Sequence, residues 1–120
     1  MEALKKITAK YVLILDANDV LIDGDLSDII NKFKKEDKKL FYNATCNNYP
    51  NIEIDKIPNR ETRGKFKYFN AGCCIGFTKY AIEFYEYAQQ YMNLDNPWKS
   101  EQFIIRNAFK DKMADIDFDF

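Results

Sequence analysis

The chain has 120 residues, of which 47% are hydrophobic and 16% aromatic, a composition typical of one globular domain and unlike that of a disordered segment. Its net charge of -1 provides no basic field for nucleic acid, and no apolar run approaches the ~18 residues that a membrane span needs. The first six residues lack the apolar centre of a signal peptide, so we expect a soluble domain with no targeting signal, no nucleic-acid partner and no membrane partner.

The reactive side chains narrow the chemistry further. The chain has no histidine, which excludes Ser-His-Asp and Cys-His catalysis and the histidine-based zinc sites. Its cysteines, Cys46, Cys73 and Cys74, are odd in number and lack the spacing of a zinc site or a disulfide framework. We expect them to be buried, reduced thiols, which weakly favours a reducing compartment. Acid, base or metal chemistry must therefore rest on carboxylates, amides and backbone groups.

The first predicted strand carries the main candidate for a metal site. Residues 11–15 are five consecutive apolar residues, typical of a buried strand in a parallel sheet. Asp16, Asn18 and Asp19 follow at its carboxyl end, where open α/β sheets bind ligands. Two carboxylates there form a hard, oxygen-rich site suited to Mn²⁺ or Mg²⁺. In the alternative interpretation, Asp16 caps a turn and Asp19 is merely solvated, because aspartate is an ordinary turn residue.

A helix and a second strand come next. Residues 25–35 form a predicted amphipathic helix whose apolar face consists of Leu26, Ile29, Ile30 and Phe33. Residues 39–43 are predicted to be a short strand, so that the first strand, this helix and the second strand form a β-α-β unit. Residues 44–65 have no sustained periodicity and are predicted to be a long loop, of the kind that is often functional.

The third predicted strand, residues 66–69, ends at a turn of small residues. Ala71 and Gly72 leave room for a ligand at the backbone, and Gly72 and Gly76 can adopt φ > 0 at little cost. The Asn70 amide can both donate and accept hydrogen bonds, so the turn suits a hydroxyl-rich ligand. The alternative is an ordinary strand-to-helix connection whose small residues allow tight packing.

A helix over residues 78–92 is predicted to follow, with Thr78 as its N-cap. Its aromatic face packs in the core in this interpretation, and that face consists of Tyr80, Phe84, Ala88 and Tyr91, extended by Ala81 and Tyr85.

The last predicted helix, residues 100–109, begins with a second polar group. Ser100 is a suitable N-cap, and Glu101 and Gln102 are placed to contact a substrate hydroxyl. The alternative for both side chains is helix capping. Residues 114–120 alternate polar and apolar residues and are predicted to form a closing strand.

Four segments, taken in order, resemble the GT-A glycosyltransferases, and most closely the glycosyltransferase domain of the procollagen lysyl hydroxylases and related collagen galactosyl- and glucosyltransferases. Residues 12–22 (V-L-I-L-D-A-N-D-V-L-I) are similar to the family's strand ending in D-x-x-D-V, which holds manganese. Residues 40–50 (L-F-Y-N-A-T-C-N-N-Y-P) are similar to a strand followed by F-S-A-E…C-W-P. Residues 67–76 (K-Y-F-N-A-G-C-C-I-G) are similar to the Y-L-N-S-G-x-x-I-G turn beside the donor sugar. Residues 100–105 (S-E-Q-F-I-I) are similar to the D-D-Q-L-F-Y helix start, whose acids face the transferred sugar.

The resemblance implies an α/β fold, with a partial GT-A (Rossmann-like) mixed sheet flanked by helices. Residues 1–120 would be a single domain that resembles the C-terminal catalytic part of such an enzyme. The implied activity is metal-dependent transfer of a sugar from a UDP-sugar donor to a hydroxyl acceptor, such as collagen-like hydroxylysine. Asp16 and Asp19 would hold Mn²⁺ (or Mg²⁺) as a D-x-D-like motif, Glu101 would be the catalytic carboxylate, and the sugar contacts would come from Asn18, Asn70, Ala71, Gly72 and Gln102.

Departures from the family pattern leave a second function open. Ser100 stands where the family has an acid, and Cys73 stands where it often has a second glycine. The family's strands that hold uracil and ribose would precede Met1, and a later metal-binding histidine would follow Phe120. The alternative function is therefore a non-catalytic module that binds carbohydrate, metal or another subunit. Because a half-domain would leave an unpaired strand edge near Tyr11, we expect the chain either to self-associate or to transfer sugar poorly. A nucleotide site of another type is disfavoured because the chain has no G-x-G-x-x-G or G-K-[ST] motif.

Overall fold

The computed structural model describes residues 2–18, 20–47, 49, 68–93, 100–112 and 118–119. In chain order its elements are α1 (Glu2–Lys5), β1 (Tyr11–Leu15), α2 (Leu26–Lys35), β2 (Leu40–Thr45), β3 (Tyr68–Phe77), α3 (Thr78–Ala88), the 3₁₀ helix η2 (Gln89–Tyr91), α4 (Glu101–Lys112) and β4 (Phe118–Asp119). Over these described ranges, none of the helices is long and apolar enough to cross a membrane.

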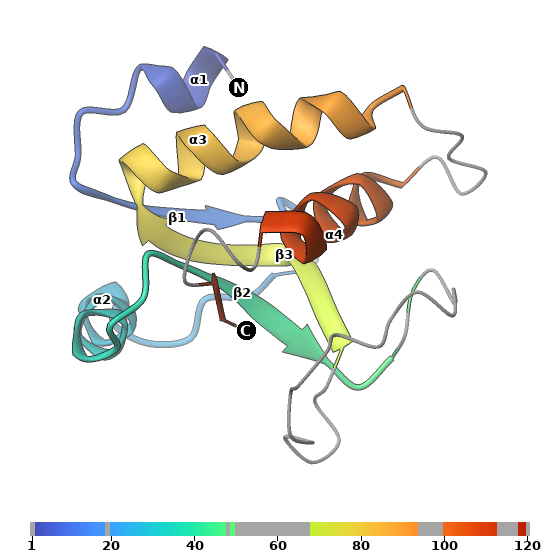
Figure 1. The fold of residues 1–120 in the computed structure, drawn as a ribbon. Helices are drawn as coiled ribbons and strands as arrows, with labels where there is room; N and C mark the ends of the chain where they lie inside the picture. The colour runs from blue at the N-terminus through green and yellow to red at the C-terminus, as the bar shows by residue number, and fades with distance from the viewer. Residues whose placement is uncertain are drawn as a thin grey trace.

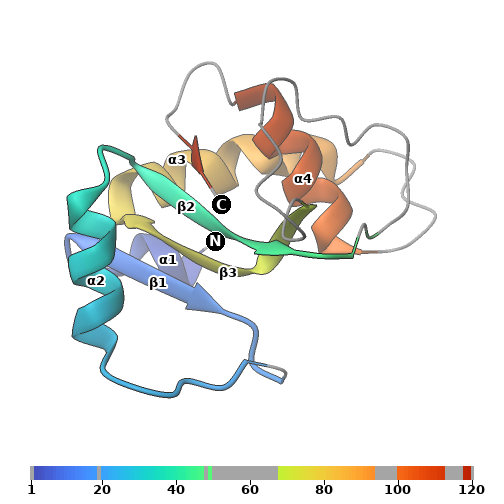
Figure 2. The same cartoon turned by 90° about the horizontal axis from the view of Figure 1, so that it is seen from below.

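The four strands form one mixed sheet in the order β1-β3-β2-β4. β3 is antiparallel to both β1 and β2, whereas β4 is parallel to β2. Helices α1, α3 and α4 cover one face of the sheet, and α2 covers the other (Figures 1 and 2). The α/β class with a mixed, helix-flanked sheet is thus confirmed. The prediction that residues 11–15 belong to a parallel pair is wrong, because the strand beside β1 is the antiparallel β3.

The β1-α2-β2 unit forms much as the sequence pattern indicates. Asp25 is the N-cap of α2, and its Oδ1 accepts a hydrogen bond from the Ser27 backbone N–H at 2.8 Å. Phe33 is the buried residue of this helix, and its ring lies edge-on to three rings of the sheet, those of Tyr11, Phe41 and Phe77. β1 and β2 run in the same direction because both are antiparallel to β3, which lies between them.

β3 does not end at Asn70 as predicted but continues to Phe77. Its register with β2 shifts within it: Tyr42 pairs with Cys74, but the next β2 residue, Asn43, pairs with Asn70. Residues 71–73 therefore form a bulge that has no counterpart in β2. The strand continues because β1 supports it from the other side, where the last pair joins Leu15 to Cys73.

The predicted use of Gly72 and Gly76 for a positive φ is wrong, since among the described glycines only Gly24 has one, at 121°. Instead, both positions in β3 require glycine because a side chain would collide with neighbouring atoms. A Cβ on Gly76 would lie 2.5 Å from the Leu40 side chain and 2.6 Å from the Lys39 carbonyl oxygen. The missing side chain of Gly76 therefore lets β3 lie close to the start of β2.

The hydrophobic core lies between the sheet and helices α3 and α4. The rings of Tyr42, Phe69 and Phe109 pack with centroids 4.8 to 5.8 Å apart, and Phe84 from α3 joins them. The predicted core face of α3 is confirmed at its buried residues, Ala81, Phe84 and Ala88. On the outside of α3, Lys5 of α1 forms an ion pair with Glu86 at 2.7 Å.

Two predictions about the ends of elements need comment. Thr78 is not the N-cap of α3, because Phe77 occupies that position and the Thr78 hydroxyl donates instead to the Ala9 carbonyl at 2.7 Å. The predicted closing strand is present as β4, which pairs with the start of β2. The predicted loop at 44–65 begins later than expected, since residues 44 and 45 belong to β2, and residues 50–67 lie outside the described part of the chain.

Candidate functional site

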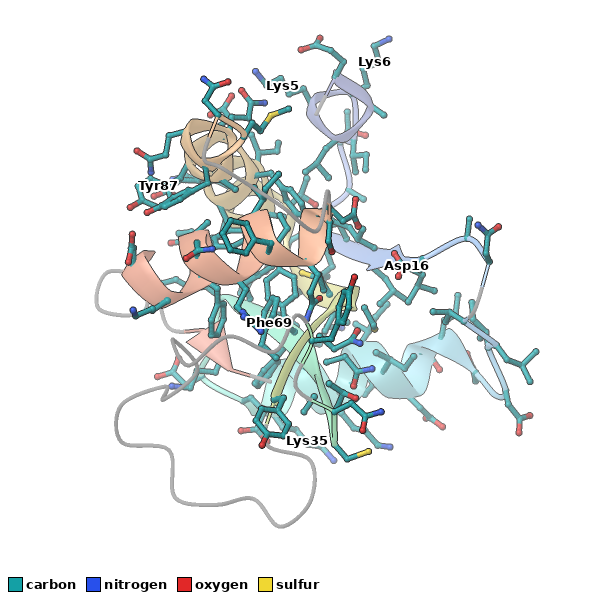
Figure 3. The ribbon with its side chains drawn as sticks, turned by 90° about the vertical axis from the view of Figure 1, so that its right-hand side faces the viewer. Lys5, Lys6, Asp16, Lys35, Phe69 and Tyr87 are labelled. Atoms are coloured by element: carbon teal, nitrogen blue, oxygen red, sulfur yellow. The ribbon has the colours of Figure 1, made fainter. Side chains whose placement is uncertain are left out.

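Asp16 lies where β1 ends (Figure 3). Its backbone N–H donates to the Gly72 carbonyl at 2.9 Å, so the carboxyl end of β1 is anchored to the bulge of β3. Val12 and Ile14 face the core under α3 and α4, and alternation along the strand places Asp16 on the same side of the sheet. The Asp16 side chain is itself exposed.

Gly72 and Asn70 lie directly against this carboxylate. A Cβ on Gly72 would lie 2.7 Å from Asp16 Oδ2 and 3.0 Å from Asn70 Oδ1, so only glycine fits here without displacing a neighbour. Asn70 Oδ1 accepts a hydrogen bond from the Gly72 backbone N–H at 2.8 Å. Three of the predicted site residues, one just after β1 and two in β3, thus lie close together.

Glu101 lies at the start of α4, and its charge acts on a tyrosine of α3, Tyr85. Tyr85 is largely buried, and burial is the main cause that raises the pKa of its hydroxyl to about 12. Repulsion from Cys74 and from the carboxylates of Glu101 and Asp16 adds to this rise. Glu101 begins α4, which covers the face of the sheet to which Asp16 belongs, so the two carboxylates lie on the same side of the sheet although 85 positions separate them (Figure 1).

Sequence reasoning missed Tyr85 as part of this region and assigned it only to the core-facing stripe of α3. A buried tyrosine needs somewhere to direct its polar hydroxyl, which is the signal that could have singled it out. Its neighbour Tyr42 is more deeply buried, at 3% exposed, and the Tyr42 hydroxyl has no hydrogen-bond partner of good geometry among the described residues. Burial raises the pKa of Tyr42 well above its ordinary value.

The cysteines are free thiols, as expected, but not all are buried. Cys46 is exposed after β2, Cys73 is half-buried in the bulge and Cys74 is fully buried. Burial, with a smaller effect from the Asp16 carboxylate, raises the pKa of Cys73. Burial therefore favours the protonated form of the thiol beside the candidate site.

Gln102 makes contacts that the sequence did not suggest. Its Oε1 accepts from the Ala71 backbone N–H at 2.6 Å, and its Nε2 donates to the Phe69 carbonyl at 2.7 Å. The same nitrogen lies 3.4 Å from the Tyr49 carbonyl oxygen, to which Arg106 also donates at 3.1 Å. In this structure the amide of Gln102 and the N–H of Ala71 are thus engaged with each other, and a sugar contact for either stays a prediction.

The remaining predicted ligands are Asn18 and Asp19. Asn18 is exposed in the turn after β1, whereas Asp19 lies outside the described residues, so its distance from Asp16 stays a prediction. In the part of the chain that is described, no three acidic, histidine or cysteine side chains are grouped so as to hold a metal ion. A cation there would need oxygen ligands from Asp19 or from its substrate as well as from Asp16.

Comparison with known proteins identifies the family of the chain. No individual curated protein matches it significantly. Residues 1–116, almost the whole sequence, match the family model described as the PLOD GT domain. The match confirms the likeness to the lysyl hydroxylase and collagen glycosyltransferase domains that the four motifs indicated. With its mixed α/β sheet and the polar group at the end of β1, the chain belongs to the PLOD glycosyltransferase domain family.

Proposed function

We propose that this domain binds a UDP-sugar through a divalent cation and transfers the sugar to a hydroxyl acceptor such as a collagen-like hydroxylysine. The observation that carries the proposal is the meeting of Asp16, Gly72 and Asn70 where β1 ends and β3 bulges. Residues 1–120 act as one domain in this proposal, since a single core cluster includes residues of all three long strands and of α3 and α4.

In this proposal the cation is Mn²⁺ or Mg²⁺, held by Asp16 and Asp19. Asp16 is exposed at the end of β1, and the missing side chain of Gly72 lets its carboxylate lie close to the backbone of β3. A magnesium-like cation is commonly bound by one or two carboxylates together with substrate phosphates, so Asp16 and Asp19 would suffice as protein ligands. When bound, such a cation neutralises the charge that develops on a diphosphate leaving group.

The other side chains orient the sugar. The Asn70 oxygen is engaged with Gly72, so its amide nitrogen is the donor that it would offer to a sugar hydroxyl or phosphate oxygen. Glu101 is exposed in the first turn of α4, and its carboxylate would accept a proton from an acceptor hydroxyl or face the positive charge of an oxocarbenium-like transition state. Asn18 extends the polar surface beyond β1 in this proposal.

The test compares ligand-induced stabilisation of the wild-type chain with that of Asp16→Asn, which keeps the shape of the side chain and removes its charge. Mn²⁺ with UDP should raise the melting temperature of the wild type, because a ligand specific for the folded state stabilises it. Asp16→Asn should lose that rise, whereas Asp23→Asn, which neutralises an exposed aspartate in the same loop, should keep it. An equal rise in all three proteins would overturn the assignment of Asp16. Release of UDP from a UDP-sugar with a hydroxylysine peptide then tests transfer.

One observation favours a non-catalytic binding module as the second candidate. Ser100 leaves Glu101 as the one carboxylate at the first positions of α4, where related enzymes have a pair. A binding module would show the Mn²⁺-dependent rise with UDP-sugars but no UDP release. Restoring the acid with Ser100→Asp and measuring release distinguishes a weakened enzyme from a module, since only the enzyme would gain activity.

A further inference from the structure

The bulge of β3 is a point where the strand lacks regular support from both neighbours. Residues 71–73 have no counterpart in β2, and the paired part of β1 reaches only as far as Cys73. A strand leaving its neighbours exposes backbone N–H and C=O groups, which must find other partners if they are shielded from water. The partners of the Phe69 carbonyl and the Ala71 N–H therefore show what holds the strand at the bulge.

Gln102 supplies those contacts from α4. A side-chain amide carries the same donor and acceptor as a peptide group, and Gln102 uses both: Oε1 accepts from the Ala71 N–H at 2.6 Å, and Nε2 donates to the Phe69 carbonyl at 2.7 Å. Phe69 and Ala71 are two residues apart, as are the groups that a neighbouring strand would bond. The Gln102 amide thus takes the place of one step of a β-ladder.

The two hydrogen bonds of Gln102 lie next to the candidate site in both β3 and α4. Ala71 precedes Gly72, whose carbonyl accepts a hydrogen bond from the Asp16 N–H and where an added Cβ would lie 2.7 Å from Asp16 Oδ2. Gln102 follows Glu101, so the same two hydrogen bonds also fix the start of α4 relative to β3. The Tyr49 carbonyl, bonded by Arg106 and approached by Gln102, ties the segment after β2 to the same helix.

We infer that Gln102 is a positioning residue, which holds the β3 bulge against α4 and thereby places Gly72 beneath Asp16, without contacting the substrate itself. Its effect on ligand binding rests on the proposed function, but its effect on the bulge does not. Without the Gln102 amide, the Ala71 N–H loses its hydrogen-bond acceptor. The hydrogen bond between the Asp16 N–H and the Gly72 carbonyl should weaken as a consequence.

The experiment uses two substitutions of Gln102 and one matched control. Gln102→Leu removes both hydrogen-bonding groups at similar volume, and Gln102→Glu keeps an acceptor for Ala71 but cannot donate to Phe69 when ionised. Gln90→Leu makes the same chemical change at an exposed glutamine in η2. Circular dichroism establishes that each variant is folded, and Gln102→Glu, the milder change, keeps the test available if Gln102→Leu does not fold.

Two readouts need no ligand. Hydrogen exchange of the Ala71 amide should be at least tenfold faster in Gln102→Leu, intermediate in Gln102→Glu and unchanged in Gln90→Leu. Labelling of the half-buried Cys73 by a small thiol reagent, followed by peptide mass spectrometry, should accelerate in the same order, with the exposed Cys46 as internal reference. Unchanged exchange and labelling in both Gln102 variants would overturn the inference, whatever the domain binds.

A third readout separates positioning from direct contact. If Gln102 acts through Gly72 and Asp16, its substitution weakens Mn²⁺-dependent binding of UDP and of UDP-glucose by the same factor. Weakening confined to UDP-glucose, with normal exchange at Ala71, would show a direct sugar contact and would also overturn the inference. A wild type that binds neither ligand would contradict the proposed function and leave the exchange result to decide the role of Gln102.

Discussion

Gly72 determines the geometry of the candidate site because it has no side chain. A Cβ at this position would lie 2.7 Å from Asp16 Oδ2, and the Gly72 N–H and C=O are both engaged, with Asn70 and with the backbone of Asp16. Gly76, four residues along the same strand, is also required by space, but its neighbours are Leu40 and the Lys39 carbonyl. The two glycines offer a matched pair for separating effects on the site from effects on the core.

Gly72→Ala should cost stability and function together. The new Cβ must displace the Asp16 carboxylate or the Asn70 amide, both of which are side chains that can move, so we expect a loss of about 1 kcal/mol in the free energy of unfolding. The Mn²⁺-dependent rise in melting temperature should fall sharply. Gly76→Ala pushes against backbone and core and should cost more, about 2–3 kcal/mol, while the folded fraction keeps its Mn²⁺ response. Denaturant unfolding and thermal shift measure both; a normal Mn²⁺ response in Gly72→Ala would argue against the site.

Tyr85 predicts a stability change at high pH. Burial and the nearby negative groups raise the pKa of its hydroxyl to about 12, above the ordinary value near 10 that applies when the chain is unfolded. The folded state therefore favours the protonated phenol, and this contribution is complete below pH 10 and is lost as the pH rises through 12. Between these values the wild type should lose about 2–3 kcal/mol more than Tyr85→Phe, whose side chain does not titrate. Parallel loss in the two proteins would show that the hydroxyl is accessible to solvent.

At the scale of elements, the local patterns were good guides and the pairing of strands was not. The apolar run at 11–15 and the periodicity of 25–35 predicted β1 and α2 closely, since both patterns depend on neighbours along the chain. The antiparallel position of β3 between β1 and β2 depends on contacts across the sheet. The spacing of apolar residues along the sequence does not predict these contacts.

The same distinction applies to the site. Asp16 and Glu101 could be named as candidates because Asp16 follows a recognisable strand and Glu101 begins a helix. The continuation of β3 past Gly72 was not predicted, because a turn of small residues and a bulge look alike in sequence. The contacts of Gln102 were missed for a related reason: its partners are backbone groups 31 and 33 positions away, and backbone partners leave no trace in the sequence.

Helix α2 provides a prediction about acid stability. The Asp25 carboxylate accepts a hydrogen bond from the Ser27 N–H at the start of this helix, which lowers the pKa of Asp25. Its contribution is therefore present above the unfolded pKa near 4 and is lost as the pH falls through the lower folded value. Asn is an equally good N-cap that does not titrate, so Asp25→Asn should lose less stability than the wild type below pH 4. Urea unfolding at pH 2.5, 4 and 6 tests this; identical pH profiles would indicate that the cap contributes nothing.

At the scale of the whole molecule, the described residues leave one edge of the sheet without a neighbouring strand. β1 is the outermost strand of the sheet that the described residues form, and it carries no charge, proline or bulge of the kind that blunts exposed strand edges. Apolar side chains extend this surface beyond the strand, including Leu21, which is 90% exposed. Beside it, a cavity of about 320 Å³ lies between β1, the following loop and α2, and Leu13, Leu15 and Ile22 are among its lining residues.

An apolar edge next to an apolar patch favours association of the chain with itself. We expect sedimentation of the purified chain to show a dimer whose fraction rises with concentration. Leu13→Lys places a charge on the edge strand and should shift the equilibrium at least tenfold toward the monomer, and Leu21→Lys, at a more exposed position, serves if the first variant is unstable. Met92→Lys puts the same charge on an exposed apolar residue after η2 and should leave the dimer intact. A wild-type chain that stays monomeric at high concentration and binds UDP tightly would show that the β1 edge is not adhesive, and that the nucleotide is held by more than the groups around Asp16.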